Sequence, residues 1–479
     1  MDKRLLYGLF LIGIAAMIFS LAFPPAADYT KDSSYFHERI ISTIAQNGHI
    51  SSIDAQSYQG RELTGLFIFH YFVAPFYALF GQSALHFITV LLLAGCIVLV
   101  GIITFDLTHS RKLSLIAAIT AMFIPSLMQL TSETSPLLFT FFLFLSCIAL
   151  FFRLPQHQYL YATTLTLFAL TSPLSLIYAL SFTAYLLISS HKKYLKRDRE
   201  VYIFSTALII WLQLIIYKKA LFFHGISLIY SNLPQTYLPN VFFDQHILTL
   251  LTLVGFIPAL LGAYAAYHYV SRAKREDIFL FSIVLVIITL LFARLLTAEQ
   301  GIPLLGLVIS ILFAQGIGLL NTQLKALKSK TLSYALLTLI FIAFLATSVV
   351  PTLTLHKEPL LTTQEKTDLA TLPLPQNATI MTTLDKAHAV AFITKRPVAA
   401  DSNFLFVDNS DFVVQDIDNI YSSSFASQAL PFLERYSATH ILYFDEDVKK
   451  YGLNSYLDDC FKLISNTSII LYEVRCTTQ

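Results

Sequence analysis

The sequence predicts an α-helical polytopic membrane protein with a small α/β domain at its C-terminal end. Three observations support this class: 56% of the 479 residues are hydrophobic, the mean hydropathy is +0.65, and apolar runs of about 18 or more residues recur along the chain. Each run is long enough to cross a bilayer as a helix, and a soluble globular protein does not carry so many. The formal net charge is only +2, and nothing indicates a nucleic-acid partner.

Eleven apolar segments qualify as membrane-spanning helices. They lie at 5–23, 84–105, 113–130, 136–152, 158–171, 173–190, 201–217, 247–270, 278–293, 301–320 and 331–350. Because the number is odd, the two ends of the chain lie on opposite sides of the membrane. The turns on the N-terminal side hold 16 basic residues and the opposite loops between helices hold six, so the positive-inside rule places the N-terminus in the cytoplasm. The loop 24–83 is then extracytoplasmic.

The last part of the chain, 351–479, differs in composition from the transmembrane domain, 1–350. It holds 16 acidic and 10 basic residues and no run long enough to span a membrane. Short β-rich runs alternate in it with helical stretches, which is typical of a small α/β layer structure, here on the extracytoplasmic side of the cell membrane. Cys460 and Cys476 flank a predicted hairpin with its turn at 465–468, and outside the cell they could form a disulfide or remain two thiols.

The first extracytoplasmic loop holds an unusual concentration of charge for this chain. Among its charged residues are Asp28, Asp32, Glu38, Arg39, Asp54, Arg61 and Glu62. From 32 to 46 the helical period places Phe36, Ile40, Ile41 and Ile44 on one side and polar residues on the other, the pattern of a helix that lies in the membrane interface. The loop therefore predicts a polar pocket held at a membrane surface.

Several motifs then follow in a characteristic order. Asp32 with Tyr35-Phe36-His37-Glu38-Arg39 is followed by Gly48, by Asp54, by Ser57-Tyr58-Gln59-Gly60-Arg61, by an amphipathic stretch at 67–81 and by Thr131-Ser132-Glu133-Thr134-Ser135-Pro136. Over about residues 28–153 this order resembles the opening of the GT-C glycosyltransferases, such as oligosaccharyltransferase catalytic subunits, protein O-mannosyltransferases and aminoarabinose transferases. The resemblance implies a GT-C-like fold of about eleven transmembrane helices. It also implies transfer of a sugar from a polyprenyl-phosphate or polyprenyl-diphosphate carrier on the extracytoplasmic face.

The resemblance also implies a catalytic aspartate in the first external loop. Asp32 is one candidate, and its other interpretation is a cap of its own helix. The spacing from Asp32 to His37 is one residue longer than in oligosaccharyltransferases, so Asp28 is the second candidate. Such a carboxylate would activate the acceptor hydroxyl, and cationic groups would stabilise the leaving phosphate.

The predicted substrate-binding residues are Tyr35, His37, Arg39, Asp54, Arg61, Glu133 and Arg294. Three of these have a purely structural interpretation as well. His37 lies beside the apolar stripe and could be a packed residue, and Glu133 suits the start of the fourth span by its charge. Arg294, at the outer end of the ninth span, is either a bidentate clamp for phosphate or an interfacial anchor.

Two departures from the family patterns limit what is carried over. A metal-dependent relative would have an Asp-x-Asp pair where this chain has Glu133-Thr134-Ser135, and one carboxylate is a poor divalent site unless the first loop supplies another. A Mg or Mn ion is therefore a possible cofactor with unknown ligands. The only tryptophan, Trp211, falls in a predicted span, so transfer directed by an acceptor sequon is not expected.

A second function class also fits a polytopic protein with an external pocket. A transporter or a lipid-binding membrane scaffold would bind a polyprenyl-linked sugar or a membrane lipid without reacting. Transport favours ionisable residues in the middle of the spans, and the predicted spans have almost none. We therefore expect an enzyme with a lipid-linked donor, and the sequence does not identify its acceptor.

Overall fold

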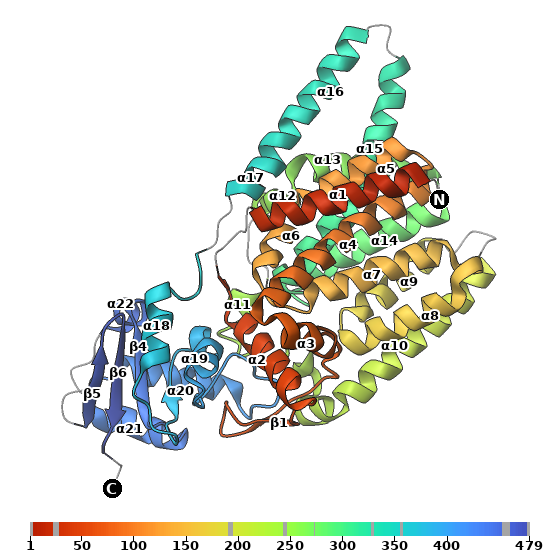
Figure 1. The fold of residues 1–479 in the computed structure, drawn as a ribbon. Coiled ribbons are helices and arrows are strands. Elements are labelled where there is room, and N and C mark those ends of the chain that lie inside the picture. The colour runs from red at the N-terminus through yellow and green to blue at the C-terminus, as the bar shows by residue number, and fades with distance from the viewer. Residues whose placement is uncertain are drawn as a thin grey trace.

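The computed structural model describes residues 3–22, 28–189, 195–242, 247–272, 274–326, 330–354, 358–452 and 460–476. A helical bundle makes up most of these residues, and a small unit with a sheet lies at one end of it (Figure 1). The bundle and this unit meet through the loop that follows the first helix.

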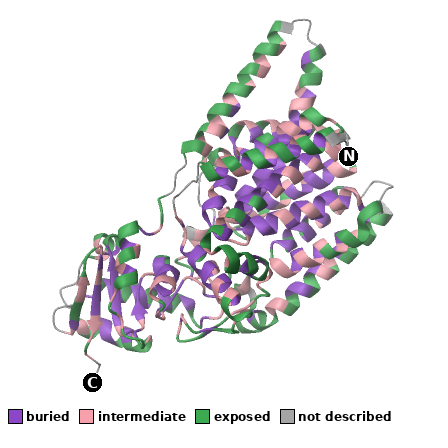
Figure 2. Cartoon of the chain, viewed as in Figure 1, coloured by how far each residue is buried: buried purple, intermediate pink, exposed green. Residues whose placement is uncertain are grey.

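The bundle consists of helices joined by short turns. Its elements are α1 (Lys3–Ala22), α4 (Gln82–Thr108), α5 (Arg111–Met122), α6 (Pro125–Gln129), the 3-10 turn η1 (Leu130–Ser132), α7 (Leu137–Phe152), α8 (Leu154–Thr171), α9 (Ser175–Ile188), α10 (Leu195–His224), η2 (Gly225–Tyr230), α11 (Leu238–Val241), α12 (Ile247–Val254), α13 (Phe256–Arg272), α14 (Arg275–Phe292), α15 (Ala298–Ala326), α16 (Lys330–Phe344), the π-helical turn η3 (Leu345–Val349) and α17 (Val350–Thr354). In α15, 89% of the most apolar window is buried, so this helix forms the centre of the bundle. The corresponding share for the segment α16–α17 is 11%, and its outer face is exposed (Figure 2).

Each of the eleven expected spans falls on an apolar helix or on two consecutive helices. Within the described residues, five helices are long and apolar enough to cross a membrane, or up to seven if each of two bent pairs is one span. Others, such as α7 and α9, are apolar but shorter. The membrane class is supported by these helices and by exposed apolar side chains such as Phe10 and Leu339, which suit contact with lipid. The number eleven remains a prediction.

Two of the expected straight spans are bent. The helices α5 and α6 meet at 53°, where Pro125 begins α6 and cannot continue the hydrogen bonding of α5. The helices α12 and α13 meet at 93°, at Gly255 with a φ of 97°. A side chain on Gly255 would start 2.7 Å from the hydroxyl oxygen of Ser348, so both the backbone angle and the space require glycine there.

The C-terminal unit confirms the predicted small α/β structure. Its strands β3 (Ile380–Met381), β4 (His440–Phe444), β5 (Phe461–Asn466) and β6 (Ile469–Val474) form one sheet in the order β3-β4-β6-β5. The pair β3–β4 is parallel, and the other two pairs are antiparallel. Around the sheet lie α18 (Thr363–Thr371), the turn η4 (Leu384–Lys386), α19 (Ala387–Thr394), α20 (Ser410–Ser422), α21 (Ala426–Arg435) and α22 (Asp445–Tyr451). The strands β4 and β6 are the two inner strands of this order, and all five residues of β4 are buried.

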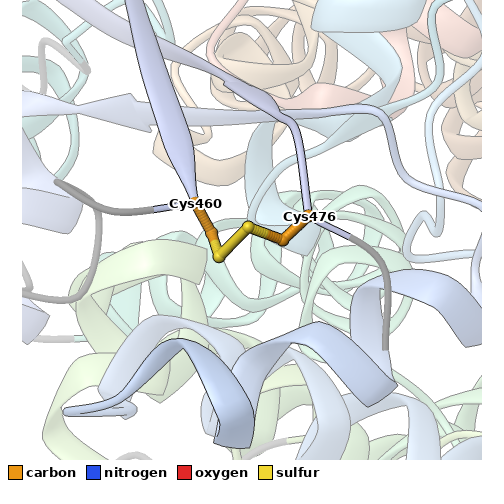
Figure 3. The surroundings of a disulfide bond; sticks show 2 residues. All are labelled: Cys460 and Cys476. Atoms are coloured by element: carbon orange, nitrogen blue, oxygen red, sulfur yellow. A yellow bond between two sulfur atoms is a disulfide. The ribbon is translucent and has the colours of Figure 1, made fainter. Parts of the chain in front are cut away.

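Cys460 and Cys476 form a disulfide, the first of the two states left open by the sequence (Figure 3). Their Cα atoms are 5.1 Å apart, at the open end of the hairpin made by β5 and β6. The bond therefore joins the hairpin at the end opposite its turn. The cysteines of the bundle, Cys96 and Cys147, are buried and free.

The loop between α1 and α4 is folded into α2 (Asp32–Asn47), the two-stranded ribbon of β1 (Ile53–Asp54) and β2 (Arg61–Glu62), and α3 (Ile68–Phe80). The predicted apolar side of α2 is buried as expected, and the helix ends at Gly48, whose N–H donates to the carbonyl of Ile44. The polar side of α2 is not open to solvent. Asp32, Glu38 and Arg39 are also buried, because the C-terminal unit packs on that side.

We expect cysteines introduced at Asn47 or Lys395 to be labelled by a membrane-impermeant maleimide in intact cells. Both side chains are exposed and lie on the side that the charge distribution assigns to the exterior. A matched cysteine at Lys112, exposed in the first turn of α5, should be labelled only after lysis. Background labelling is low because the native cysteines are either buried in the bundle or paired in the disulfide. The reverse pattern of labelling would invert the predicted topology.

Candidate functional site

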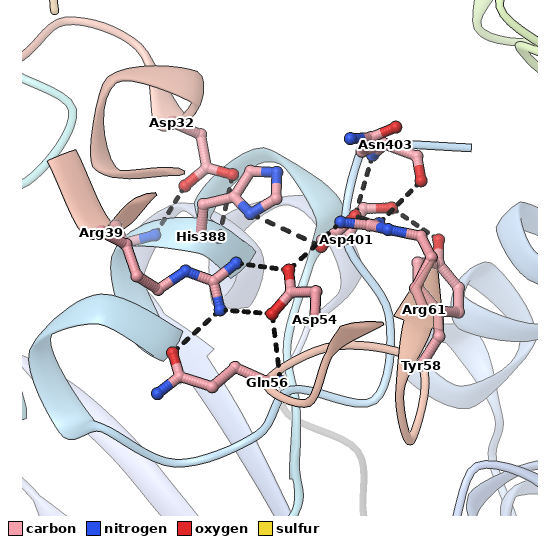
Figure 4. A network of polar contacts seen from close by, with 10 residues as sticks. Asp32, Arg39, Asp54, Gln56, Tyr58, Arg61, His388, Asp401 and Asn403 are labelled. Atoms are coloured by element: carbon pink, nitrogen blue, oxygen red, sulfur yellow. Dashed lines mark hydrogen bonds and ion pairs between the residues drawn. The ribbon is translucent and has the colours of Figure 1, made fainter. Parts of the chain in front are cut away.

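A network of buried charges joins the first loop to the C-terminal unit (Figure 4). The guanidinium of Arg39 donates to both carboxylate oxygens of Asp54, at 2.9 and 2.7 Å, and to the side-chain oxygen of Gln56 at 2.9 Å. Arg61 on β2 also contacts Asp54, with 3.4 Å between Nη2 and Oδ2. The same guanidinium forms a buried ion pair with Asp401 of the C-terminal unit. Asp54 thus lies between two arginines, one of which reaches across to the other unit.

Further polar contacts reinforce this junction. Arg61 donates to the carbonyl of Asn403 at 2.7 Å, and the hydroxyl of Tyr58 donates to the carbonyl of Asp401 at 2.6 Å. The N–H of Val398 donates to the carbonyl of Gln56 at 3.0 Å, so backbone is joined to backbone as well. Burial by itself would raise the pKa of Asp401, but His388 and Arg61 outweigh it and the pKa is about 2. Asp401 is therefore a carboxylate at every pH at which the protein is used.

Asp32 caps a helix, but not its own. Its two carboxylate oxygens accept the backbone N–H groups of His388, at 3.0 Å, and Ala389, at 2.8 Å, in the first turn of α19. The residue at the N-cap of α2 is Lys31, which makes no side-chain cap. Burial raises the pKa of Asp32 well above its ordinary value, although the two N–H groups act in the opposite direction. Asp32 thus fixes the C-terminal unit on the start of α2.

Two tyrosines and Glu38 continue the same junction. Glu38 accepts hydrogen bonds from the hydroxyls of Tyr29, at 2.8 Å, and Tyr77, at 3.1 Å, and burial raises its pKa. Tyr35 packs edge-to-face on Tyr29 with 5.0 Å between the ring centroids, and both rings belong to the hydrophobic core of the C-terminal unit. The predicted site residue Tyr35 is therefore a core residue in this structure.

A second cluster of charges forms around residues 28–31. The ammonium of Lys31 lies 3.3 Å from a carboxylate oxygen of Glu133 and 2.6 Å from one of Glu299. The hydroxyl of Thr30 donates to Glu133 at 3.2 Å. Asp28 is partly exposed and forms an ion pair with Lys366 on α18. Three short chain segments, before α2, before α7 and at the start of α15, thus converge here.

A cavity of about 290 Å³ opens beside α2, α3 and the ends of α7, α8, α10 and α15. The rings of His37 and His70 line it, with 2.9 Å between Nδ1 of His37 and Nε2 of His70. Burial lowers the pKa of His37 to about 3, so its ring is neutral at neutral pH. Other polar groups that line the cavity are Thr64, Thr140, Thr171, Ser172, Gln213, Tyr217, Gln300 and Asn403, and the one carboxylate among the lining residues is Glu62. The cavity therefore offers hydrogen-bonding groups of mostly neutral charge.

No protein-family model matches the sequence, and a comparison with curated proteins gives no match either. Solved structures of other proteins do match the fold of this chain. The oligosaccharyltransferase AglB of Archaeoglobus fulgidus in the apo form superposes with a TM-score of 0.72 at 12% identity, over 93% of this chain and 70% of that one. AglB in complex with an inhibitory peptide and a dolichol-phosphate gives 0.72 at 13% identity, over 92% and 69%. ArnT of Cupriavidus metallidurans bound to undecaprenyl phosphate gives 0.55 at 11% identity, over 98% of both chains.

The chain has the fold of the GT-C glycosyltransferases. The resemblance drawn from the order of motifs is thus confirmed at the level of the fold. In this GT-C fold the predicted residues of the first loop are brought together, but in two separate groups. Asp32, Arg39, Asp54 and Arg61 bind one another or the C-terminal unit, whereas Glu133 contacts Lys31. Asp28, next to this cluster in the chain, pairs with Lys366 of the C-terminal unit, and His37 lines the cavity.

Arg294 lies apart from the buried junction, in the turn between α14 and α15. Its side chain is exposed, and its φ of 55° turns the chain toward Glu299 at the start of α15. Sequence reasoning missed His70, His388 and Asp401 as partners of the loop, and it gave no role to Lys31. For His388 and Asp401 the sequence holds no motif, because their partners are more than three hundred residues away. Lys31 did carry a signal, since it stands between two candidate aspartates.

The residues do not fit a divalent metal. One AglB structure is described in complex with zinc and sulfate, and it superposes with a TM-score of 0.61 at 14% identity. In this chain, within the residues that the structure describes, no group of three or more His, Cys, Asp or Glu side chains could hold a metal ion. The sequence left open whether the first loop supplies a second carboxylate beside Glu133. The nearby carboxylate is instead that of Glu299, and Lys31 lies between the two. We derive no step through a metal.

We expect Arg61→Leu to lower the stability of the folded protein by roughly 3–5 kcal/mol, because it leaves the buried carboxylate of Asp401 unpaired. Lys219→Leu is the matched control. It removes the ion pair between Lys219 and Glu62, the residue that follows Arg61. This pair is exposed and contributes about 0–1 kcal/mol. Thermal unfolding of both variants in the same detergent measures the difference. Equal melting temperatures would show that the buried junction contributes little.

We also expect the melting temperature to fall as the pH is lowered from about neutral. Burial lowers the pKa of His388 from 6.5 to about 4, against the attraction of Asp401. Between these two values the unfolded chain binds more protons than the folded one, so stability is complete above pH 6.5 and declines toward pH 4. His388→Gln should show a shallower decline over this range. An identical pH profile for the variant would mean that folding does not shift the pKa of His388.

Proposed function

We propose that this protein is a membrane glycosyltransferase that moves a sugar from a polyprenyl-phosphate or polyprenyl-diphosphate carrier to an acceptor on the extracytoplasmic face. One observation carries the proposal: more than nine-tenths of the chain shares its fold with AglB and ArnT, which have been solved with dolichol-phosphate and with undecaprenyl phosphate. A shared fold alone does not determine the reaction. Support from this chain's own residues comes from the cavity and the charged cluster beside the first loop.

The cavity suits the sugar of the donor. Its volume is near the lower end of the range of roughly 300–1,000 Å³ that is usual for small-molecule sites, so it favours one or two sugar units over a long oligosaccharide. His37, His70 and Gln300 offer neutral donors and acceptors for sugar hydroxyls. Apolar neighbours such as Leu66, Phe67 and Leu137 exclude water from the space between these groups.

For the base we favour Asp28 over Asp32. Asp32 is buried beneath α19 and both of its oxygens accept backbone N–H groups, so a substrate hydroxyl would have to displace the C-terminal unit. Both oxygens of Asp28 also have partners, the backbone N–H of Tyr29 at 2.8 Å and the ammonium of Lys366, but its side chain is 28% exposed and the ion pair is partly open to solvent. Asp28 also lies three residues from Lys31, the centre of the charged cluster. A carboxylate in this position could accept the proton of an acceptor hydroxyl.

Sequon-directed transfer to protein is not part of the proposal. AglB has been solved with a tethered acceptor peptide containing an NVT sequon. In this chain Trp211 is 61% exposed on the outer face of α10, a helix long and apolar enough to cross the membrane. That position suits contact with lipid, so the tryptophan is not available to a sequon.

The test is sugar transfer by the purified protein in lipid nanodiscs. A radiolabelled hexose on undecaprenyl phosphate serves as donor, and membranes of the host cell serve as the source of acceptor. The parent protein should remove label from the lipid-extractable fraction, and Asp28→Asn should slow this by about 10²–10⁴-fold. Its melting temperature should stay close to the parent value, because an exposed ion pair contributes about 0–1 kcal/mol. Asp445→Asn, an exposed position on α22, is the matched control and should transfer normally.

The outcomes separate the enzyme from its alternatives. If the parent binds undecaprenyl phosphate but never releases label from any donor, the protein is a lipid-binding scaffold or a transporter. If Asp28→Asn transfers as fast as the parent, Asp28 is not the base. Asp32→Asn is a poor probe of catalysis, because its NH₂ group would face a backbone N–H of α19 and destabilise the junction.

A further inference from the structure

Lys31 stands between two carboxylates that come from distant parts of the chain. Glu133 lies between η1 and α7, and its side chain is only 1% exposed. Glu299 is in the first turn of α15 and is 36% exposed. The ammonium of Lys31, itself 28% exposed, contacts both, at 3.3 and 2.6 Å. Lys386 also contacts two carboxylates, those of Glu365 and Glu446, but both belong to the C-terminal unit.

Two carboxylates this close to one cation have few stable states of protonation and cation binding. Without a cation, one of them would take up a proton, because two negative charges in a partly buried place repel each other. With a divalent cation the formal charge of the group would be zero, and with one ammonium it is −1. Mg²⁺ and similar ions are often held by one or two carboxylates together with water and substrate oxygens. Two glutamates and the hydroxyl of Thr30 would thus be a minimal site for such an ion if Lys31 were absent.

Lys31 keeps its positive charge in the folded protein. Burial by itself would lower its pKa, but the carboxylates of Glu299 and Glu133 outweigh burial and hold the pKa above its ordinary value. The side chain is therefore an ammonium at neutral pH. A divalent cation that entered between the two glutamates would have to displace it.

We propose that the ammonium of Lys31 is the built-in cation of this site and occupies the position between Glu133 and Glu299 that a divalent cation would need. The protein then works without a bound metal at this position. Removal of the lysine opens the position to a divalent cation. The statement about activity rests on the proposed function, whereas the statement about cation binding does not.

The position of the cluster gives the proposal a consequence for the substrate. Gln300, the neighbour of Glu299, lines the cavity, as does Pro136, three residues after Glu133. An ammonium has three donors, and the two contacts to the glutamates use two of them. The third N–H can donate to a phosphate oxygen of the carrier lipid. Lys31 thus has two roles, because it neutralises the two glutamates and also binds the phosphate.

The first test is binding of Mn²⁺ by the purified full-length protein, followed by the loss of the electron paramagnetic resonance signal of free Mn²⁺. The parent protein and Lys31→Arg should bind none at this position. Lys31→Ala should bind about one equivalent, because two carboxylates, a hydroxyl and water can complete the coordination. Lys366→Ala, which removes the lysine paired with Asp28 alone, is the matched control and should behave as the parent. Adding Glu133→Gln to Lys31→Ala should abolish the binding.

Two results would overturn the proposal. One is binding of Mn²⁺ by the parent that disappears in Glu133→Gln or Glu299→Gln. The other is a Lys31→Ala protein that melts as a folded protein and leaves all Mn²⁺ free. If Lys31→Ala does not fold, the measurement on the parent and on its two glutamine variants still decides.

The second test concerns transfer from the labelled undecaprenyl-phosphate hexose. The parent should transfer equally well with and without EDTA. Lys31→Ala should transfer about 10²-fold more slowly in EDTA, which is the usual effect of losing one preorganised donor, and Mn²⁺ should restore part of the rate. Transfer by the parent that stops in EDTA and returns with Mn²⁺ would contradict the proposal. If no protein transfers sugar under any condition, the proposed function fails while Mn²⁺ binding still decides the role of Lys31.

Discussion

The ion pair between Arg61 and Asp401, with Asp54 and Arg39 behind it, is the interaction on which the arrangement of this protein depends. It is buried, and it joins a loop near the N-terminus to a domain that follows every helix of the bundle. A buried ion pair adds little net stability over an apolar contact, but an unpaired buried charge is very unfavourable. The junction therefore acts mainly by excluding other arrangements. With it in place, Asp32 reaches the first turn of α19, and residues 403–406 close one side of the cavity.

The charged residues of the first loop make contacts in two separate places. Those on α2 and the β1–β2 ribbon hold the C-terminal unit, whereas Lys31, just before α2, meets Glu133 and Glu299 at the ends of the bundle helices. Both groups lie within one short stretch of sequence, and charge alone does not separate them. Burial does, because a substrate can reach a partly exposed side chain such as Asp28, whereas Asp32 is enclosed beneath α19. This division led us to favour Asp28 over Asp32 as the base.

The likeness to AglB and ArnT shows how weakly this fold constrains sequence. At 11–13% identity the chain still follows both over more than nine-tenths of its length. Apolar helices of similar length and volume can replace one another in a bundle, so the architecture persists while individual residues change. Chemistry is less tolerant, since it requires particular groups at particular distances. The lysine between two glutamates is such an arrangement of particular groups, and we propose that it sets which cation the site can hold.

The sequence by itself determined the membrane class, the small α/β unit at the C-terminal end, the helix that begins at Asp32 and the likeness to GT-C enzymes. These follow from local patterns: apolar length, the helical period and the order of motifs along the chain. Only the tertiary structure decided that α5–α6 and α12–α13 are bent, that Cys460 bonds Cys476, and which charges face which partners. The interpretation of Asp32 as a cap of its own helix was wrong, because its carboxylate caps α19, which starts more than three hundred residues later. Periodicity describes the neighbours of a residue within its own helix, whereas a buried charge takes its role from whichever opposite charge the packed chain brings to it.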